Sequence, residues 1–305
     1  MKNIIFGPVQ SRRFGRSLGV DLSPSKKQCN FDCLYCELEA AKTINHYDDT
    51  VALHEVVDAL KEALLKHNDL DFITLTANGE PTLYPYLDAL VEAINLFKGE
   101  IKTLILSNGS TIMNPAIQKT LAKFDTVKLS LDCVNQRCLK KLDRVHNGIS
   151  IDEIMQGMLE FKKHYKGDLI IEILFVKDIN DRDIAPYNQF LLKLQPVRID
   201  IGTIDRPPAY DVKPLSYEEL LRLAQAFEVT LPVYIASRKN VATAPSMYTQ
   251  EEILATLSKR PLTDEDIAIL MDVQSQKLLQ RLLEMGQIEK IRKNGLIFYK
   301  IAKLS

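Results

Sequence analysis

The chain has 305 residues and a net charge of −1, and 46% of its residues are hydrophobic. This composition is typical of a folded globular protein, and it excludes disordered, collagen-like and coiled-coil chains. The apolar stretches are too short to span a membrane and the N-terminus does not look like a secretory signal, so we expect a cytoplasmic protein without a membrane partner. The nearly balanced charge also excludes a protein whose whole surface is basic and binds polyanions such as nucleic acids.

Strands and helices alternate along most of the chain. The pattern predicts strands at residues 17–23, 71–76, 102–106, 126–131, 169–176 and 198–202. It predicts helices between and after them at 51–66, 86–97, 115–124, 151–165, 183–194 and 217–227. Such alternation predicts an α/β fold with a parallel sheet and right-handed crossovers. The periodicity does not decide whether the sheet closes into a full barrel.

The sequence changes character at residues 241–247, a predicted linker between one domain at 1–240 and a smaller one at 248–305. The smaller domain is predicted to contain helices at 251–257, 265–271 and 275–285 and strands at 288–292 and 296–301. Lys293-Asn294-Gly295 joins the two strands, and Asn-Gly between apolar strands indicates a hairpin. Three helices and a hairpin are typical of a winged helix-turn-helix domain, which can bind DNA, position RNA, recognise a peptide or contact the barrel.

Three of the five cysteines form a C-x3-C-x2-C pattern: Cys29, Cys33 and Cys36. Thiolates bind soft metals, and three in one loop suit three corners of an iron–sulfur cluster. A zinc site with His46 as the fourth ligand, or three unliganded thiols, are the alternatives. Three ligands leave one iron of a 4Fe–4S cluster without a protein thiolate. Such an open position is where a substrate or cofactor binds.

This loop resembles the signature of the radical S-adenosylmethionine (SAM) enzymes, which have an aromatic residue just before the last cysteine, as Tyr35 is here. The resemblance implies a partial (β/α)6 TIM-like barrel and a 4Fe–4S cluster on Cys29, Cys33 and Cys36. In that family the open iron chelates SAM, and one electron cleaves SAM to a 5′-deoxyadenosyl radical. The resemblance further implies Tyr35 near the adenine and an electron donor of the flavodoxin or ferredoxin type.

Further motifs follow the predicted strands in the order that this family would have them. Residues 77–82 look like its Gly-Gly-Glu motif, in which Glu80 would face the SAM ammonium group, although Asn78 stands where many members have glycine. Similar motifs end the next two strands, and the carboxyl ends of strands are where β/α barrels have active sites. The SAM-binding residues implied by the resemblance are Tyr35, Asn78, Gly79, Glu80, Ser107, Asn108, Ser130 and Asp132.

Other side chains have two interpretations each. Glu172, inside an apolar strand, either pairs with a lysine of a neighbouring strand or has a functional role. Three arginines before the first predicted strand either bind a substrate anion near the barrel mouth or, as we slightly favour, pair with surface carboxylates. These arginines are Arg12, Arg13 and Arg16. We expect Cys133 and Cys138 to be two reduced thiols rather than ligands.

Residues 7–19, with the motifs at 78–83 and 205–208, look like a branch related to wyosine-tRNA synthases. Those enzymes carry a second cluster on upstream cysteines, and this chain has none before Cys29. We therefore expect a radical SAM enzyme that abstracts hydrogen from an unidentified substrate, with tRNA or another RNA first and a peptide or small metabolite next. The alternatives are a metal- or redox-sensing DNA-binding regulator acting through the winged helix, and a structural zinc protein.

Overall fold

The computed structural model describes residues 4–11, 13–235, 245, 247–259, 261–293 and 296–302. Arg12, most of the predicted linker at 241–247, and the hairpin residues Asn294 and Gly295 therefore lie outside the described residues.

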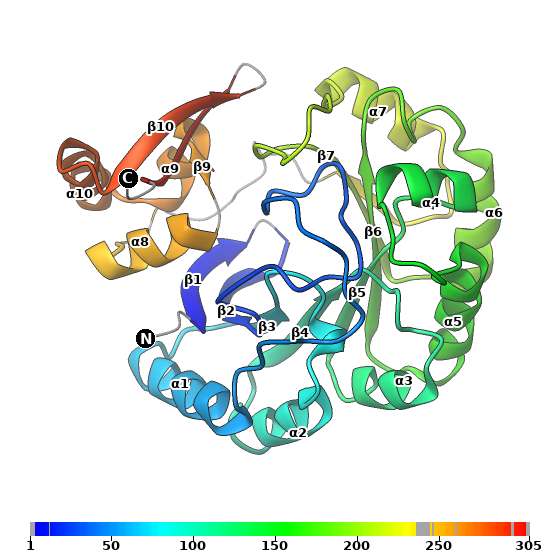
Figure 1. The fold of residues 1–305 in the computed structure, drawn as a ribbon, viewed down its shortest axis with the longest axis horizontal. Coiled ribbons are helices and arrows are strands. Elements are labelled where there is room, and N and C mark those ends of the chain that lie inside the picture. Colours follow the sequence, from blue (N-terminus) through cyan, green and yellow to red (C-terminus); the bar gives the residue numbers. More distant parts are fainter. Residues whose placement is uncertain are drawn as a thin grey trace.

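One curved sheet forms the larger part of the molecule (Figure 1), and its eight strands follow one another in chain order. The first strand is antiparallel to the second, and all later neighbours are parallel, as predicted. The strands are β1 (Ile5–Ser11), β2 (Gly15–Asp21), β3 (Phe72–Thr76), β4 (Lys102–Ser107), β5 (Thr126–Ser130), β6 (Asp168–Phe175), β7 (Arg198–Thr203) and β8 (Val233–Ile235). The expectation of six strands was too low, because Gly7-Pro8 interrupts the pattern of β1 and β8 has only three residues.

Helices follow the parallel strands and lie on the outer side of the sheet (Figure 1). They are α1 (Leu53–Lys66), the 3-10 turn η1 (Pro81–Leu83), α2 (Leu87–Phe97), α3 (Pro115–Leu121), α4 (Gln136–Leu142), α5 (Ile151–His164), α6 (Ala185–Leu194) and α7 (Tyr217–Gln225). The sequence did not predict α4, a seven-residue helix whose first turn is capped by the Asn135 side chain.

Alternation along the strands separates an apolar outer face from a polar inner face. On β2 and β3, Val20 and Leu75 are fully buried in the core beneath the helices. Their neighbours Gly19, Asp21 and Thr76 line a cavity on the other face. Because successive strand residues point to opposite faces, the sheet supplies both a core and a polar interior.

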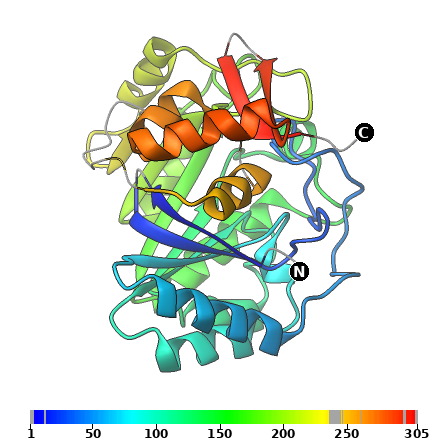
Figure 2. The same ribbon diagram turned by 90° about the vertical axis from the view of Figure 1, so that its left-hand side faces the viewer.

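The C-terminal residues form a second hydrophobic core, in which Ile253, Met271 and Leu282 are fully buried. The predicted three helices and hairpin are present, with one additional short strand. The elements are α8 (Gln250–Lys259), β9 (Leu262–Thr263), α9 (Asp264–Leu270), α10 (Val273–Glu284), β10 (Ile288–Lys293) and β11 (Leu296–Ile301). Figure 2 shows α8 beside β1, and Glu252 of α8 reaches His67 after α1 at 3.8 Å. No helix within the described residues has the length and apolar character needed to cross a membrane.

Candidate functional site

The cysteine loop connects β2 to α1 and is attached to the end of β3 through its backbone. The Gln28 N–H donates to the Asn78 carbonyl at 2.8 Å, and the Glu80 N–H donates to the Gln28 carbonyl at 3.0 Å. Gly79 lies between these two bonds with φ +145°, and a Cβ there would come within 1.8 Å of the Gln28 carbonyl oxygen. Only glycine permits this approach, so the predicted glutamate motif holds the cysteine loop directly.

Glu80 connects this motif to the end of β4. Its buried carboxylate accepts hydrogen bonds from the Thr82 N–H at 3.0 Å, the Thr82 hydroxyl at 2.6 Å, the Ser107 hydroxyl at 2.7 Å and the Asn108 N–H at 2.7 Å. Burial raises the pKa of Glu80, and these hydrogen bonds offset part of the rise. The carboxylate thus has internal donors already, in addition to any cofactor group that it was predicted to meet.

The end of β5 meets the cysteine loop through Tyr35. The Tyr35 hydroxyl donates to the Asp132 carboxylate, whose other oxygen accepts from the Leu174 N–H at 2.7 Å. Burial raises the pKa of Asp132 to about 7. Ser130, two residues before Asp132, lines the same small pocket as Asp132 and Asn108. The residues predicted from strand ends are therefore gathered around one loop.

The donor chemistry of the loop fits an iron–sulfur cluster. Cys29, Cys33 and Cys36 are free and partly exposed. Burial raises the pKa of Cys29 to about 12 and also raises the pKa of Cys33 and Cys36, so the metal-free thiols are neutral and metal binding would release protons. The Asn108 amide nitrogen lies 3.7 Å from the Cys29 sulfur, as a hydrogen-bond donor of the kind that tunes such clusters.

The zinc alternative does not gain from the geometry. His46 is 75% exposed, lies 3.4 Å from Asp48 and hydrogen-bonds with Asn45, so its contacts are not with the cysteines. In the described part of the chain, no three His, Cys, Asp or Glu side chains are grouped so that they could hold a metal ion. Ligands of one zinc converge within about 2.3 Å of a point, whereas cluster thiolates bind different irons. The loop therefore suits a cluster better than a single ion.

Sequence reasoning missed several side chains that surround the loop. Lys27 is 8% exposed, pairs with Asp32 at 3.0 Å and hydrogen-bonds with the Cys36 thiol. Tyr210, far along the chain after β7, donates its hydroxyl to the same Asp32 carboxylate. Burial opposes ionisation of Asp32, but hydrogen bonds from Tyr210 and Lys27 outweigh it and lower the Asp32 pKa. Only the charged pair within the loop had a sequence signal, since Lys27 and Asp32 flank Cys29.

A second missed contact joins the loop to the residues after β7. Arg206 Nη1 donates to both Glu37 carboxylate oxygens at 2.8 Å, and the Ala209 N–H donates to the Cys36 carbonyl at 2.8 Å. Glu37 and Arg206 also line a cavity of about 270 Å³ on the inner face of β2, β3 and β4. Its walls combine aromatic rings with hydroxyl groups. They include Phe6, Phe14, Ser17, Thr74, Thr76 and Asn78.

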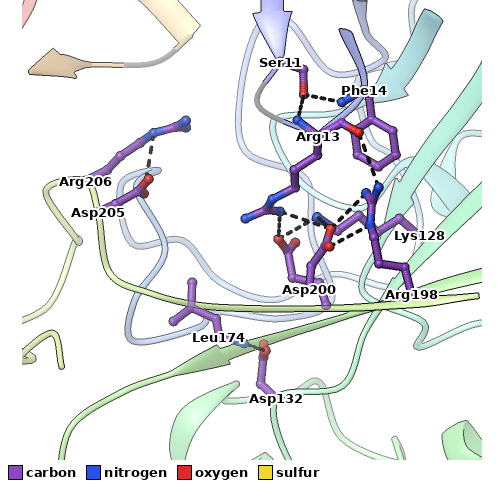
Figure 3. A network of polar contacts seen from close by, with 11 residues as sticks. Ser11, Arg13, Phe14, Lys128, Asp132, Leu174, Arg198, Asp200, Asp205 and Arg206 are labelled. Carbon is purple, nitrogen blue, oxygen red and sulfur yellow. Dashed lines mark hydrogen bonds and ion pairs between the residues drawn. The ribbon is translucent and has the colours of Figure 1, made fainter. Parts of the chain in front are cut away.

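Of the two interpretations of Arg13, the less favoured one, a substrate-binding side chain near the barrel mouth, was wrong. Arg13 lies in the turn before β2, at the opposite end of the strands from the cysteine loop, where it pairs with Glu172 and lies 3.6 Å from Asp200 (Figure 3). Lys128 of β5 pairs with the same two carboxylates at 2.6 and 3.3 Å. Burial alone would raise the Glu172 pKa, but Lys128 and Arg13 lower it to about 2.

For two other residues, the interpretation as a structural ion pair is confirmed. Glu172 pairs with a lysine of the neighbouring strand, and Arg16 pairs with the surface carboxylate of Asp69 at 3.1 Å. Arg12 lies outside the described residues.

The expectation of two reduced thiols at Cys133 and Cys138 was also wrong for this structure. A disulfide joins them, with their Cα atoms 5.5 Å apart. The Asn135 side chain accepts from the Cys138 N–H at 2.9 Å and so begins α4 immediately after the end of β5. This tight start brings the cysteines within the range that a disulfide spans.

Comparisons with known proteins give a consistent result. The family model of the Radical SAM superfamily matches residues 24–191. A relative from Helicobacter pylori (strain J99), named UPF0026 protein, is 40% identical over 304 residues and covers 97% of each chain. A Selenomonas ruminantium protein named S-adenosylmethionine-dependent nucleotide dehydratase is 32% identical over 124 residues, which are 40% of this chain and 42% of that protein. A solved radical SAM methyltransferase from Sphaerobacter thermophilus has a similar fold, with TM-score 0.57 and 17% identity over 72% of this chain and 66% of its own.

Proposed function

The chain belongs to the radical SAM superfamily, and we propose that Cys29, Cys33 and Cys36 hold its cluster while the neighbouring strand ends bind SAM. The protein is an iron–sulfur enzyme, and the cofactors of its family are a 4Fe–4S cluster and SAM. When bound, this pair supplies the one-electron chemistry that removes a hydrogen atom from a substrate. The residues of the chain bind and orient the cofactors and shield them from water.

One observation carries the assignment of residues. Every strand end that was expected to bind SAM has a hydrogen bond to the cysteine loop or to a residue that does. Asn78 and Glu80 bond to Gln28, Asn108 reaches Cys29, and Asp132 accepts from Tyr35. Chance turn motifs would not meet at one loop. We propose Tyr35, Asn78, Gly79, Glu80, Ser107, Asn108, Ser130 and Asp132 as the SAM-binding residues.

Electrostatics supports a positively charged cofactor at this end. Asp143 directly follows α4 and hydrogen-bonds with the Cys33 thiol. Within the described residues, no Lys or Arg lies within ion-pair distance of Glu80, Asp132 or Asp143. Burial raises the pKa of all three carboxyl groups. SAM brings a sulfonium and an ammonium group, and such charges near buried carboxylates would favour their ionised form.

For the substrate we propose a nucleotide, free or within an RNA. The Selenomonas relative is named for action on a nucleotide, and a cavity of about 270 Å³ with aromatic and hydroxyl walls has room for one base or nucleoside rather than a polymer. We keep the relation to wyosine-tRNA synthases within this proposal because of the motifs at residues 7–19, 78–83 and 205–208. A peptide remains the second substrate class.

The C-terminal elements would serve such a substrate as a winged helix-turn-helix domain of residues 248–305, separated from a barrel domain of 1–240 by the linker at 241–247. Its hydrophobic core is distinct from that of the sheet, and its three-stranded sheet contains the hairpin expected of a wing. The names of the relatives give no support to the alternative of a DNA-binding regulator. We place the enzyme in the cytosol, where reducing conditions would keep the cluster thiols available and would also act to open the Cys133–Cys138 disulfide.

The test is anaerobic reconstitution of the full chain with iron and sulfide, followed by EPR of the reduced protein with and without SAM. We expect a 4Fe–4S signal that changes when SAM is added. Cys33→Ala should lose the signal, whereas Cys138→Ala, the matched cysteine control outside the loop, should keep it. Zinc in the loop, or a cluster whose spectrum ignores SAM, would overturn the proposal.

A further inference from the structure

The outer side of α4 carries concentrated positive charge. Its four basic residues are Arg137, Lys140, Lys141 and Arg144, which we call the α4 face. All four are exposed, and the only acidic residue of positions 135–148, Asp143, is buried. Among the described residues, the first three have no carboxylate within ion-pair distance, and Arg144 reaches Asp32 at 3.7 Å. The face therefore presents a net positive charge to solvent.

The inner side of α4 is bonded to the cysteine loop. The Leu34 N–H donates to the Leu142 carbonyl at 2.9 Å, and the Asp32 N–H donates to the Asp143 carbonyl at 3.0 Å. The Asp143 carboxyl group also hydrogen-bonds with the Cys33 thiol. Figure 1 shows α4 on the outside of the molecule, beyond the blue segment that carries the loop. A helix about 10–12 Å across is thus what separates Cys33 from anything docked on the α4 face.

Within the cysteine loop, Lys26 and Lys27 are paired with carboxylates, and the exposed Lys42 is a single charge rather than a group. Lys26 lies 3.4 Å from Asp48, and Arg206 bonds to Glu37 at 2.8 Å. The whole chain has a net charge of −1, so the molecule as a whole offers no attraction to an acidic protein. Only a local surface can provide it, and the α4 face has the required sign and place.

We propose that the α4 face is the docking surface for an acidic electron-carrier protein that reduces the cluster. This inference rests on the proposed function, because it requires a cluster at the cysteine loop. In the step, the carrier loses one electron and the cluster gains it, with no bond made or broken. Opposite charges raise the rate of encounter and set the orientation of the partner. Electron transfer slows steeply with distance, so docking next to Cys33 favours it.

RNA is the other macromolecule that a cationic surface attracts. Proteins that hold single-stranded RNA combine cations with aromatic side chains on which bases stack. The helix α4, with the sequence QRCLKKL, contains no aromatic residue, and the Tyr210 ring beside the face is already covered by the Arg144 guanidinium at 4.6 Å. The observations therefore favour an acidic protein on this face, and RNA binding becomes an outcome of the test.

The test compares two double variants of the reconstituted full chain. K140E/K141E reverses two charges of the α4 face. K162E/K163E makes the same change near the end of α5, at the far end of the sheet from the cysteine loop. A reduced flavodoxin of net negative charge is the probe, and cluster reduction is followed by stopped-flow absorbance at several salt concentrations. Dithionite, a small reductant that needs no docking face, reduces each sample in parallel.

We expect K140E/K141E to lower the flavodoxin-driven rate at low salt by about tenfold or more and to weaken its salt dependence. K162E/K163E should behave as the unaltered protein, and dithionite should reduce all samples equally. A flavodoxin-driven rate that K140E/K141E leaves unchanged overturns the proposal. So does a variant that keeps this rate and loses affinity for RNA.

Two measurements separate this proposal from the proposed function. EPR with and without SAM reports whether the cluster and its open iron exist in each variant. The Kd of oxidised flavodoxin for the same chains needs no cluster. If the cluster is absent and K140E/K141E still raises the Kd of flavodoxin by about tenfold or more, the docking face stands and the enzyme assignment fails. If flavodoxin binds both variants equally, the docking face fails.

Discussion

The inner face of the sheet holds carboxyl groups in two contrasting environments. In the middle of β6 and β7, Glu172 and Asp200 are surrounded by Lys128, Arg198 and Arg13, which reaches them from the turn before β2 (Figure 3). Lys128 and Arg13 lower the Glu172 pKa to about 2. At the cofactor end, burial raises the Asp132 pKa to about 7, and no cation within the described residues pairs with it.

Glu172 and Asp200 thus have cations of the protein as partners, and we call this set the finished network. Asp132, near the cysteine loop, has none within the described residues. Removing one partner of a buried ion pair leaves an uncompensated charge and strongly destabilises the fold. Carboxyl groups whose pKa is raised by burial, with no cation to offset it, are typical of functional sites. The finished network thus attaches the turn between β1 and β2 to β5, β6 and β7. The carboxyl groups near the cysteine loop are instead left for a positively charged ligand to pair with.

The largest effect should follow Gly79→Ala. The new methyl group would meet the Gln28 carbonyl, whose distance to an ideal Cβ is 1.8 Å, and the backbone has φ +145°. We expect the loop to detach from β3, with loss of bound iron after reconstitution and a decrease of about 3 kcal/mol or more in the free energy of unfolding. Iron analysis and urea denaturation measure the two effects.

Gly99→Ala is the matched control, at the other end of the sheet. Gly99 also has positive φ, +58°, but nothing lies within 4 Å of its ideal Cβ. It should cost about 1 kcal/mol and leave iron binding intact. Equal loss of iron in both variants would mean that backbone strain, not the contact with Gln28, explains the result.

Asp200→Asn should give the next largest effect, because it breaks the finished network. Asp200 is fully buried and lies 2.8 Å from Arg198, 3.3 Å from Lys128 and 3.6 Å from Arg13. Removing its charge leaves those cations less compensated, so we expect a loss of about 3 kcal/mol in urea denaturation. Asp132→Asn should cost much less at neutral pH. If the two variants lower the free energy of unfolding equally, the contrast between the finished network and the carboxyl groups near the cysteine loop is wrong.

The pH dependence of stability should sharpen the contrast further. Because the native Asp132 pKa is about 7 and lies above the ordinary aspartate value of 3.8, the native state binds a proton that the unfolded state releases. Stability of the cofactor-free protein should therefore fall as pH rises from about 4 to 7, by on the order of 1 kcal/mol or more. Glu172, with its lowered pKa, contributes in the opposite sense below pH 4.5.

Asp132→Asn should flatten this decline, measured as the thermal midpoint of the metal-free chain between pH 4 and 7. An unchanged slope would assign the effect to other buried carboxyls, of which Asp143 and Glu80 also have raised pKa values.

The sequence predicted the parts of the site that depend on strand direction. Parallel strands end at the same edge, so Glu80, Asn108 and Asp132 could be expected together, and the structure brings them to the cysteine loop. The loop itself was visible because cysteine spacing is local. Which side chains of neighbouring strand ends face each other depends on the register of the sheet. The alternation of apolar and polar residues along each strand indicates that register.

The remaining contacts join segments without a common period. Tyr210 bonds to Asp32 across 178 positions, and nothing in either segment indicates the other. Arg13 could have been placed correctly, since a residue before a parallel strand lies at the opposite end from one after it. The broken pattern of β1 hid the turn that aims Arg13 inward. The α4 face was missed because a seven-residue helix is too short for a periodic signal.

The smallest effect should come from Asp69→Ala, at the end of the sheet from which Arg13 reaches the finished network. Asp69 pairs with Arg16 at 3.1 Å, but its side chain is 62% exposed and water screens the pair. We expect a change of about 0.5 kcal/mol or less, reduced further in high salt, against about 3 kcal/mol for Asp200→Asn. Urea denaturation at two salt concentrations measures both. Asp200 is fully buried among Arg198, Lys128 and Arg13, whereas Asp69 is exposed and pairs with Arg16. A similar cost for both variants would show that neither the burial of Asp200 nor its additional cations strengthen its ion pairs.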